Sequence, residues 1–276
     1  MLIYNHQSGR LGNAAFRYIA AIIFGSIYNI QFTMTDTLPP NSIPINDEYY
    51  VEWLAKAKSN QPPQIDLTKN YIFVGYFQHD YSQFKEIIKT YIKNHPDDRL
   101  WTDGNTHNTN EYDYPATFYT ASQLLSNNLT TYIPQYDIVV HLRLEDSIEG
   151  NRTMDPKSII RILNDLHTET NTKICFVVNT PKTQIENQYI NSLRQPYENT
   201  IIESNDPITD YHIMKNARIL ITSLSTLSWI AALMNDSLTQ LYFPNVKSHR
   251  NLICESIQTP IQNTIIYHYD IISFIC

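Results

Sequence analysis

A histidine and an arginine stand two residues apart at the end of an apolar stretch, DIVVHLRLED, residues 137–146. Its β-branched residues predict a buried strand. Alternate residues of a strand point to the same side, so His141 and Arg143 share one face at the carboxyl edge of the predicted sheet. Ligands bind at that edge in open α/β sheets, and the planar guanidinium suits phosphate. The alternative is a salt bridge from Arg143 to Glu145 or Asp146.

A second stretch with polar side chains beside an apolar run is SLSTLSWIAALMN, residues 223–235. Ser225 and Thr226 stand where a predicted strand ends and a predicted helix begins. The free N–H groups of a helix N-terminus attract anions, so this position is a candidate phosphate site. The alternative is an ordinary N-cap, for which serine and threonine are expected. The two interpretations are compatible.

Two of the six glycines of the chain lie close together near its start. Gly9 and Gly12 flank Arg10 and Leu11 and precede Asn13, in a turn expected between a strand and a helix. Glycines let the backbone approach an anion closely. The alternative is a plain tight turn. The spacing G-x-x-G is neither the dinucleotide fingerprint nor the P-loop, and neither motif occurs elsewhere in the chain.

The elements that must position these residues alternate between strands and helices, which is typical of parallel sheets covered on both faces. We expect a first domain over residues 1–134 and a second over 135–276. Strands are predicted at residues 1–5, 31–35, 71–77, 136–142, 173–178, 199–203, 218–222 and 239–243, and helices at 14–28, 50–58, 81–93, 117–129, 155–166, 183–194, 208–216 and 226–234. Residues 38–63 are proline-rich and 95–115 are polar and rich in turn residues.

The composition excludes several classes of protein. A net charge of −7 disfavours nucleic acid as a partner, and three scattered cysteines are too few for a disulfide framework or a zinc site. No apolar run approaches ~20 residues, and the start lacks the pattern of a signal peptide. We therefore expect no membrane span and a cytoplasmic protein, bacterial or viral, acting in the host cytoplasm if viral. No pattern indicates an oligomeric state.

Four motifs occur in a recognisable order: GRLGN at 9–13, GYFQ at 75–78, HLRLED at 141–146 and STLSW at 225–229, with Asp210 and Met214 before the last. Over residues 1–235 the chain resembles the α-1,2-fucosyltransferase family and, more distantly, the protein O-fucosyltransferases. The resemblance implies an α/β, GT-B-like fold of two Rossmann-like domains with parallel sheets facing across a cleft. It also implies an inverting, metal-independent transfer of a sugar, with fucose favoured, from a nucleoside diphosphate sugar to a glycan hydroxyl.

The resemblance also implies roles for single residues. Arg143 would contact the donor diphosphate, His141 the nucleotide or pyrophosphate, and Asp210 the base or ribose. The remaining donor-binding residues are Ser225 and Thr226 on phosphate, Asn179 at the end of its strand, and Gly9, Arg10, Leu11, Gly12 and Asn13, which would close on the donor from the first domain. No cofactor or metal is implied, because the nucleotide sugar is a co-substrate and no Asp-x-Asp stands at a strand end.

The chain departs from the family pattern at several positions. The family's glutamine after G-R-L-G-N is Ala14, the asparagine before S-T is Leu224, and the second tryptophan is Ile230. In H-x-R-R-G-D, the second arginine is Leu144 and the glycine is Glu145.

These departures bear on the donor more than on the fold. GDP-fucose leads, and UDP-xylose or another UDP-sugar is the alternative. Glu145 would repel phosphate unless Arg143 or Arg152 neutralises it. Replacing Leu144 by Arg is expected to change donor preference more than total activity.

An inverting transfer benefits from a general base for the acceptor hydroxyl. The candidates are His79, Asp80 and Asp146. The alternative for the first two is that they cap the helix expected from Tyr81. A hypothesis from another class is a carbohydrate-binding pseudoenzyme without turnover. A nucleotide-binding oxidoreductase or kinase is disfavoured because its fingerprints are absent.

Overall fold

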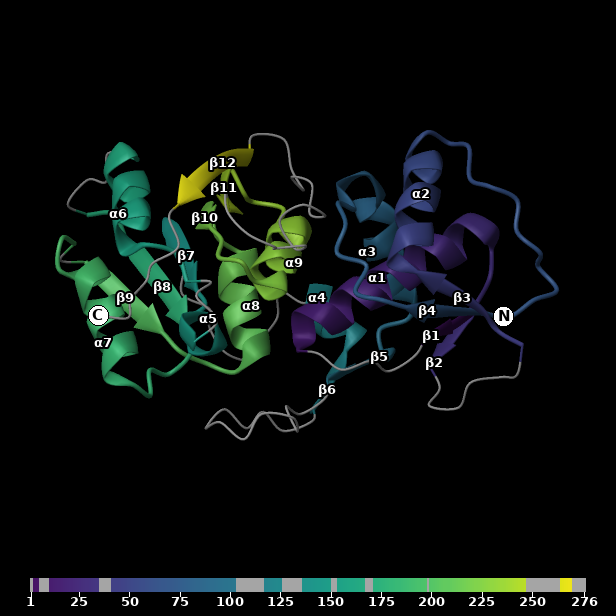
Figure 1. The fold of residues 1–276 in the computed structure, drawn as a ribbon, viewed down its shortest axis with the longest axis horizontal. Helices are drawn as coiled ribbons and strands as arrows, with labels where there is room; N and C mark the ends of the chain where they lie inside the picture. The colour runs from purple at the N-terminus through teal and green to yellow at the C-terminus, as the bar shows by residue number, and fades with distance from the viewer. Residues whose placement is uncertain are drawn as a thin grey trace. The chain divides into compact units, whose positions relative to one another are not determined.

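The computed structural model describes residues 2–4, 10–34, 41–102, 117–125, 136–149, 153–166, 171–197, 199–246 and 264–269. The chain divides into two compact units, Met1–Ser126 and Asn127–Cys276 (Figure 1). Each unit contains a parallel sheet with helices, which confirms the predicted class of two Rossmann-like α/β units. The cleft expected between them stays a prediction.

The first unit is built on a four-stranded sheet in the order β2-β1-β4-β3, in which every neighbouring pair is parallel. The strands are β1 (Leu2–Tyr4), β2 (Phe32–Met34), β3 (Ile43–Asn46) and β4 (Tyr71–Val74). The helices are α1 (Leu11–Tyr28), α2 (Asp47–Lys58), α3 (Lys85–Asn94) with the 3-10 turn η1 (Ser82–Phe84) before it, and α4 (Ala121–Leu125). A separate antiparallel pair is formed by β5 (Arg99–Thr102) and β6 (Thr117–Thr120).

Helix α1 is the core helix of this unit, and its residues from Ala14 to Gly25 are all buried. It begins three residues earlier than the pattern predicts, so Leu11, Gly12 and Asn13 form its first turn and are not a loop. By length and composition α1 is apolar enough to cross a membrane, with a mean hydropathy of 1.2, yet 78% of it is buried inside the protein. A core helix passes that test, so the test is weak evidence for a span.

The second unit contains a six-stranded sheet in the order β12-β11-β10-β7-β8-β9, again parallel throughout. The strands are β7 (Ile138–Leu142), β8 (Ile174–Val178), β9 (Thr200–Glu203), β10 (Ile219–Ile221), β11 (Gln240–Val246) and β12 (Thr264–Tyr269). The helices are α5 (Glu145–Glu149), α6 (Pro156–Asp165), α7 (Gln184–Arg194), α8 (Pro207–Lys215) and α9 (Thr226–Met234). Counted from β7, this is the 3-2-1-4-5-6 order of the dinucleotide-binding fold.

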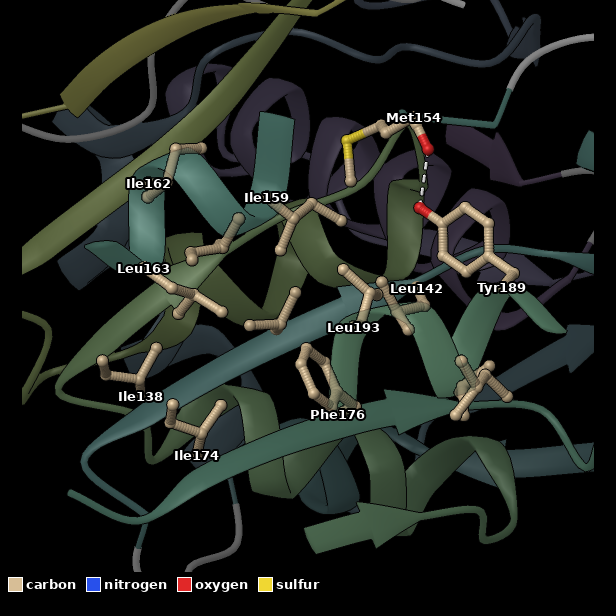
Figure 2. Close-up of a cluster of buried hydrophobic side chains, with 14 of the residues drawn as sticks. Ile138, Leu142, Met154, Ile159, Ile162, Leu163, Ile174, Phe176, Tyr189 and Leu193 are labelled. Carbon is tan, nitrogen blue, oxygen red and sulfur yellow. Dashed lines mark hydrogen bonds between the residues drawn. The ribbon is translucent and has the colours of Figure 1, made fainter. Parts of the chain in front are cut away.

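Local sequence signals explain where these helices begin. Thr183 and Glu186 form a capping box at the start of α7, and the side chain of Asp155 accepts a hydrogen bond from Lys157 N before α6. Apolar residues on the inner faces of α6 and α7 then pack in one cluster with residues of β7 and β8, among them Ile159 of α6 and Phe176 of β8, as Figure 2 shows.

The predicted helix at 117–129 is wrong in its first half. Residues Thr117–Thr120 form β6, which pairs with β5, and the helix α4 covers Ala121–Leu125, where the described residues of this stretch end. The sequence Thr-Phe-Tyr-Thr favours a strand once a partner is present, and that partner lies in the stretch we expected to be turns. Strands β3 and β12 and the short helix α5 were also not predicted.

Candidate functional site

In each sheet the family-like motifs follow two neighbouring strands, and in the second unit these are the strands at which the strand order reverses. In the second unit the chain leaves β7 toward β8 and returns on the opposite side at β10, so the reversal lies between β7 and β10. In the first unit the corresponding neighbours are β1 and β4. Ligands of open α/β sheets bind outside the carboxyl ends of such strands.

The two motifs of the second unit contact each other directly. His141 is in β7 and Ser223 follows β10, and Nδ1 of His141 lies 2.6 Å from Oγ of Ser223. Arg143, half-buried, donates from Nη1 to the carbonyl oxygen of Leu224 at 3.3 Å. Residues about 80 positions apart in the chain, 82 and 81 in these two pairs, thus form one polar group at the strand ends.

The electrostatic roles of His141 and Arg143 differ. Burial, and then the neighbouring charge of Arg143, lower the pKa of His141 to about 3. The imidazole is therefore neutral at pH 7 and offers a hydrogen bond without a charge. Arg143 supplies the positive charge at this edge, in a planar form that suits phosphate.

Helix α9 begins at this edge and supplies its N-terminus. Ser225 is the N-cap, and its Oγ accepts a hydrogen bond from Leu227 N at 3.3 Å. Thr226 is the first helical residue and is buried. The first turn contains no acidic side chain, so the positive end of the helix dipole is not neutralised from within the helix. The capping role expected for serine is present, and the phosphate role stays a prediction.

The departures at 144 and 145 both have structural explanations. Leu144 is 2% exposed and belongs to the apolar core around β7. Glu145 has φ 22°, in the left-handed region that favours glycine, which is the family residue there. Its carboxylate accepts a hydrogen bond from Asn179, and its N–H donates to Oε1 of Glu186 at 3.2 Å. The carboxylate of Glu145 therefore has an amide donor beside it.

Asp210 lies apart from the reversal point, in the first turn of α8 after β9, and β9 is two strands from β7. Its Oδ1 accepts hydrogen bonds from N and Nδ2 of Asn205, each at 3.2 Å. Burial raises the pKa of Asp210 to about 7, with smaller contributions from Asp206 and Glu203. The group is thus near half-protonation at neutral pH.

In the first unit the motifs after β1 and β4 also meet. Nε2 of Gln78 donates to Oδ1 of Asn13 in the first turn of α1 at 3.1 Å. Arg10 is the N-cap residue of that helix. Gly9 lies outside the described residues, as do the side chain of Asp146 and Arg152.

Asp47 is a residue of this region that the sequence analysis missed. Its carboxylate accepts hydrogen bonds from N of Tyr76 at 3.0 Å and N of Phe77 at 2.6 Å. Two backbone amides of the GYFQ turn are therefore bound to Asp47. A Cβ on Gly75 would lie 2.4 Å from Oδ2 of Asp47, which explains the glycine. Phe77 has φ 52° in this turn. The sequence did contain a signal for this helix start, because Asn46 is a favourable N-cap residue and Asp47 is acidic. We had predicted the helix to begin at residue 50 instead.

Of the candidate bases, Asp80 has structural partners. Its Oδ1 accepts from N and Oγ of Ser82 at 2.9 and 2.7 Å, and its Oδ2 lies 3.2 Å from Nζ of Lys58. These contacts hold the start of the 3-10 turn η1. The N-cap residues of η1 and α3 are Tyr81 and Phe84, so neither His79 nor Asp80 is an N-cap. His79 is buried, and its ring stacks on Tyr50 with centroids 5.8 Å apart. Among the described residues, no group of three or more His, Cys, Asp or Glu side chains could hold a metal ion.

No protein-family model matches the sequence, and no curated protein matches it. Three solved structures illustrate a distant likeness. The E. coli heptosyltransferase WaaC with ADP is 11% identical, with 97% of this chain and 93% of that one covered and a TM-score of 0.47. The fucosyltransferase NodZ from Bradyrhizobium is 9% identical, with 87% and 94% covered and a TM-score of 0.43. The iron-containing glycosyltransferase TibC from E. coli is 13% identical, with 87% and 57% covered and a TM-score of 0.38. We base no assignment on likenesses this distant.

Proposed function

We propose that this protein is a glycosyltransferase that moves a sugar from a nucleoside diphosphate sugar to a hydroxyl of a glycan acceptor. The observation that carries the proposal is the contact between His141 and Ser223. It joins the HLRLED motif to the segment that leads into STLSW, at the reversal point of a 3-2-1-4-5-6 sheet and beside Arg143 and the N-terminus of α9. The second unit is the donor side in this proposal, and the first unit is the acceptor side.

The chemistry of the leaving group supports this arrangement. When the glycosidic bond to a nucleoside diphosphate breaks, negative charge develops on the phosphate oxygens. The guanidinium of Arg143 and the N–H groups at the start of α9 stabilise such charge without a metal. The neutral ring of His141 adds a hydrogen bond to nucleotide or pyrophosphate. Asp210 is assigned to the base or ribose, Asn179 to donor binding at the end of β8, and Gly9–Asn13 to closure on the donor.

The transfer is assigned as inverting, in a single displacement by the acceptor hydroxyl. Asp80, His79 and Asp146 remain the candidate bases. Oδ1 of Asp80 accepts from Ser82, and Oδ2 lies 3.2 Å from Nζ of Lys58. Asp80→Asn keeps an acceptor for Ser82 but removes both the base and the ion pair with Lys58. The loss of the ion pair should cost about 0–1 kcal/mol of stability, whereas the loss of a base should abolish most of the turnover.

The donor is assigned as GDP-fucose, with UDP-xylose or another UDP-sugar as the second choice. Leu144 packs inside the core, so the second arginine of the family pattern has no counterpart at this position. The charge available to the diphosphate from residues 141–144 is then that of Arg143 alone. This favours a donor whose base and ribose contribute more of the binding.

A binding panel followed by a donor-hydrolysis screen tests the proposal. Calorimetry with GDP, UDP, ADP and NAD should show a preference for GDP or UDP. Hydrolysis of GDP-fucose, UDP-xylose, GDP-mannose and UDP-glucose then identifies the sugar, and EDTA should leave turnover unchanged. Arg143→Ala should lower turnover by about 10²–10³-fold, whereas the exposed control Arg218→Ala should not. Binding without turnover of any donor would indicate the pseudoenzyme, and no binding would reject both.

A further inference from the structure

Arg143 lines a small cavity in the second unit. Its polar lining comes from Arg143, Ser147, Thr153 and Ser223, which belong to four different segments of the chain. The rest of its wall is apolar and includes Leu142 and Tyr189. The volume is about 10 Å³, which is the space that one water molecule needs.

The hydroxyl of Thr153 is the unusual member of this lining. Thr153 is only 6% exposed, and its Oγ1 has no hydrogen-bond partner among the described residues. Buried hydroxyls are nearly always paired with protein or with ordered water, because an unpaired one loses its hydration without compensation. The backbone at this point is held in place, since Tyr189 donates from its hydroxyl to the carbonyl oxygen of Met154 at 2.6 Å (Figure 2).

We propose that one water molecule occupies this cavity and links Oγ1 of Thr153 to the guanidinium of Arg143. Buried waters need two to four polar partners, and the four polar side chains of the lining supply them. Arg143 already donates to Leu224 O at 3.3 Å, and the water adds a link to the segment that contains Thr153. Thr153 is thus a positioning residue for Arg143. Its effect on nucleotide binding rests on the proposed function, whereas the water does not.

The stability of a matched set of variants tests the water itself. Thr153→Val keeps the shape and removes the hydroxyl, so it should lower the urea midpoint, while Thr153→Ser should keep the wild-type midpoint. If the cavity is dry, Thr153→Val removes an unpaired buried hydroxyl and should instead raise the midpoint, which overturns the proposal. A crystal structure at about 1.5 Å should show one ordered water between Thr153 and Arg143. Clear density without it also overturns the proposal.

Nucleotide affinity tests the positioning role. Thr153→Val should weaken GDP or UDP binding about three- to tenfold, the range expected for one hydrogen bond, and Thr153→Ser should restore it. In an Arg143→Ala background Thr153→Val should have no further effect on affinity. The control is Thr200→Val at the opposite end of the sheet, where Oγ1 donates to Tyr197 O at 2.9 Å. It should lower stability without changing affinity.

The two proposals fail in distinguishable ways. If the wild-type protein binds no nucleoside diphosphate, the proposed function fails, and the midpoints and the density still decide whether the water is present. If the nucleotide binds but Thr153→Val binds it as tightly as the wild type, the positioning role is wrong. Equal effects of Thr153→Val with and without Arg143 would also reject that role.

Discussion

His141 is a buried base whose protonation opposes folding. Burial lowers its pKa from the ordinary 6.5 of a histidine to about 3 in the folded protein. Between these pH values the unfolded chain binds a proton that the folded chain does not. The free energy of unfolding is therefore not reduced by His141 above pH 6.5, and it decreases as the pH falls toward 3.

Replacing His141 by Asn should therefore flatten the acid side of the stability profile. Between pH 7.5 and 4.5 the wild type should lose about 2–3 kcal/mol more than His141→Asn, since each unit of pKa shift corresponds to about 1.4 kcal/mol. Urea unfolding at the two pH values measures this difference. Parallel profiles for the two proteins would show that the ring is not held neutral by burial.

Asp210 should act in the opposite direction. Its pKa is raised from 3.8 to about 7, so the folded protein keeps a proton that the unfolded chain releases. Below pH 4 Asp210 is protonated in both states and does not reduce the free energy of unfolding. As the pH rises to 7, this free energy decreases by an amount on the order of 3–4 kcal/mol. Asp210→Asn should be the more stable protein at pH 7.5 but not at pH 4. A constant difference across the range would contradict the shift.

Leu144 corrects an expectation drawn from the sequence. We expected Leu144→Arg to change donor preference, because the family has a second arginine there. The side chain is 2% exposed in the core, so an arginine would bury a charge among apolar groups. Leu144→Arg should unfold the second unit or lower its stability by several kcal/mol, whereas Leu144→Met should cost under about 1.5 kcal/mol. Thermal unfolding compares them, and a stable Leu144→Arg with a new donor would restore the original expectation.

At the scale of elements, the turn after β4 depends on the start of α2. The amides of Tyr76 and Phe77 both donate to Asp47, and Gly75 leaves no room for a side chain beside that carboxylate. This turn also places Gln78 next to Asn13, to which Gln78 donates a hydrogen bond. The glycine of GYFQ is thus explained by the close approach of another element.

Gly75→Ala should cost about 1–3 kcal/mol of stability, the usual range for overpacking. In an Asp47→Ala background the same substitution should cost less, because the atom that it meets at 2.4 Å is gone. A double-mutant cycle in urea measures the coupling. Additive effects would mean that the turn does not depend on the contact with Asp47.

At the scale of the whole molecule, each unit has its own sheet and core. A ligand that binds at the edge of one sheet should therefore slow amide hydrogen exchange at that edge only. A nucleoside diphosphate should slow amide hydrogen exchange after β7 and at the start of α9, where Arg143 and Ser225 lie. The amino ends of the same strands should be unaffected. Hydrogen exchange with and without saturating GDP or UDP tests this. Protection confined to the first unit would reverse the assignment of donor and acceptor sides.

The sequence by itself determined the features that are encoded within a few neighbouring residues. The alternation of strands and helices in the second unit, the capping positions of Asp155 and Thr183, and the sharing of one strand end by His141 and Arg143 follow from local periodicity and side-chain chemistry.

The tertiary structure decided what depends on partners distant in the chain. The strand character of residues 117–120 requires the pairing with Arg99–Thr102. The role of Asp47 requires a turn 29 residues away, and the neutrality of His141 requires burial against Ser223, 82 residues away. The order of the strands and the burial of each side chain depend on contacts between distant parts of the chain. A pattern of neighbouring residues does not contain that information. For that reason the sequence suggested that an arginine at position 144 would reach the donor, whereas packing places Leu144 in the core.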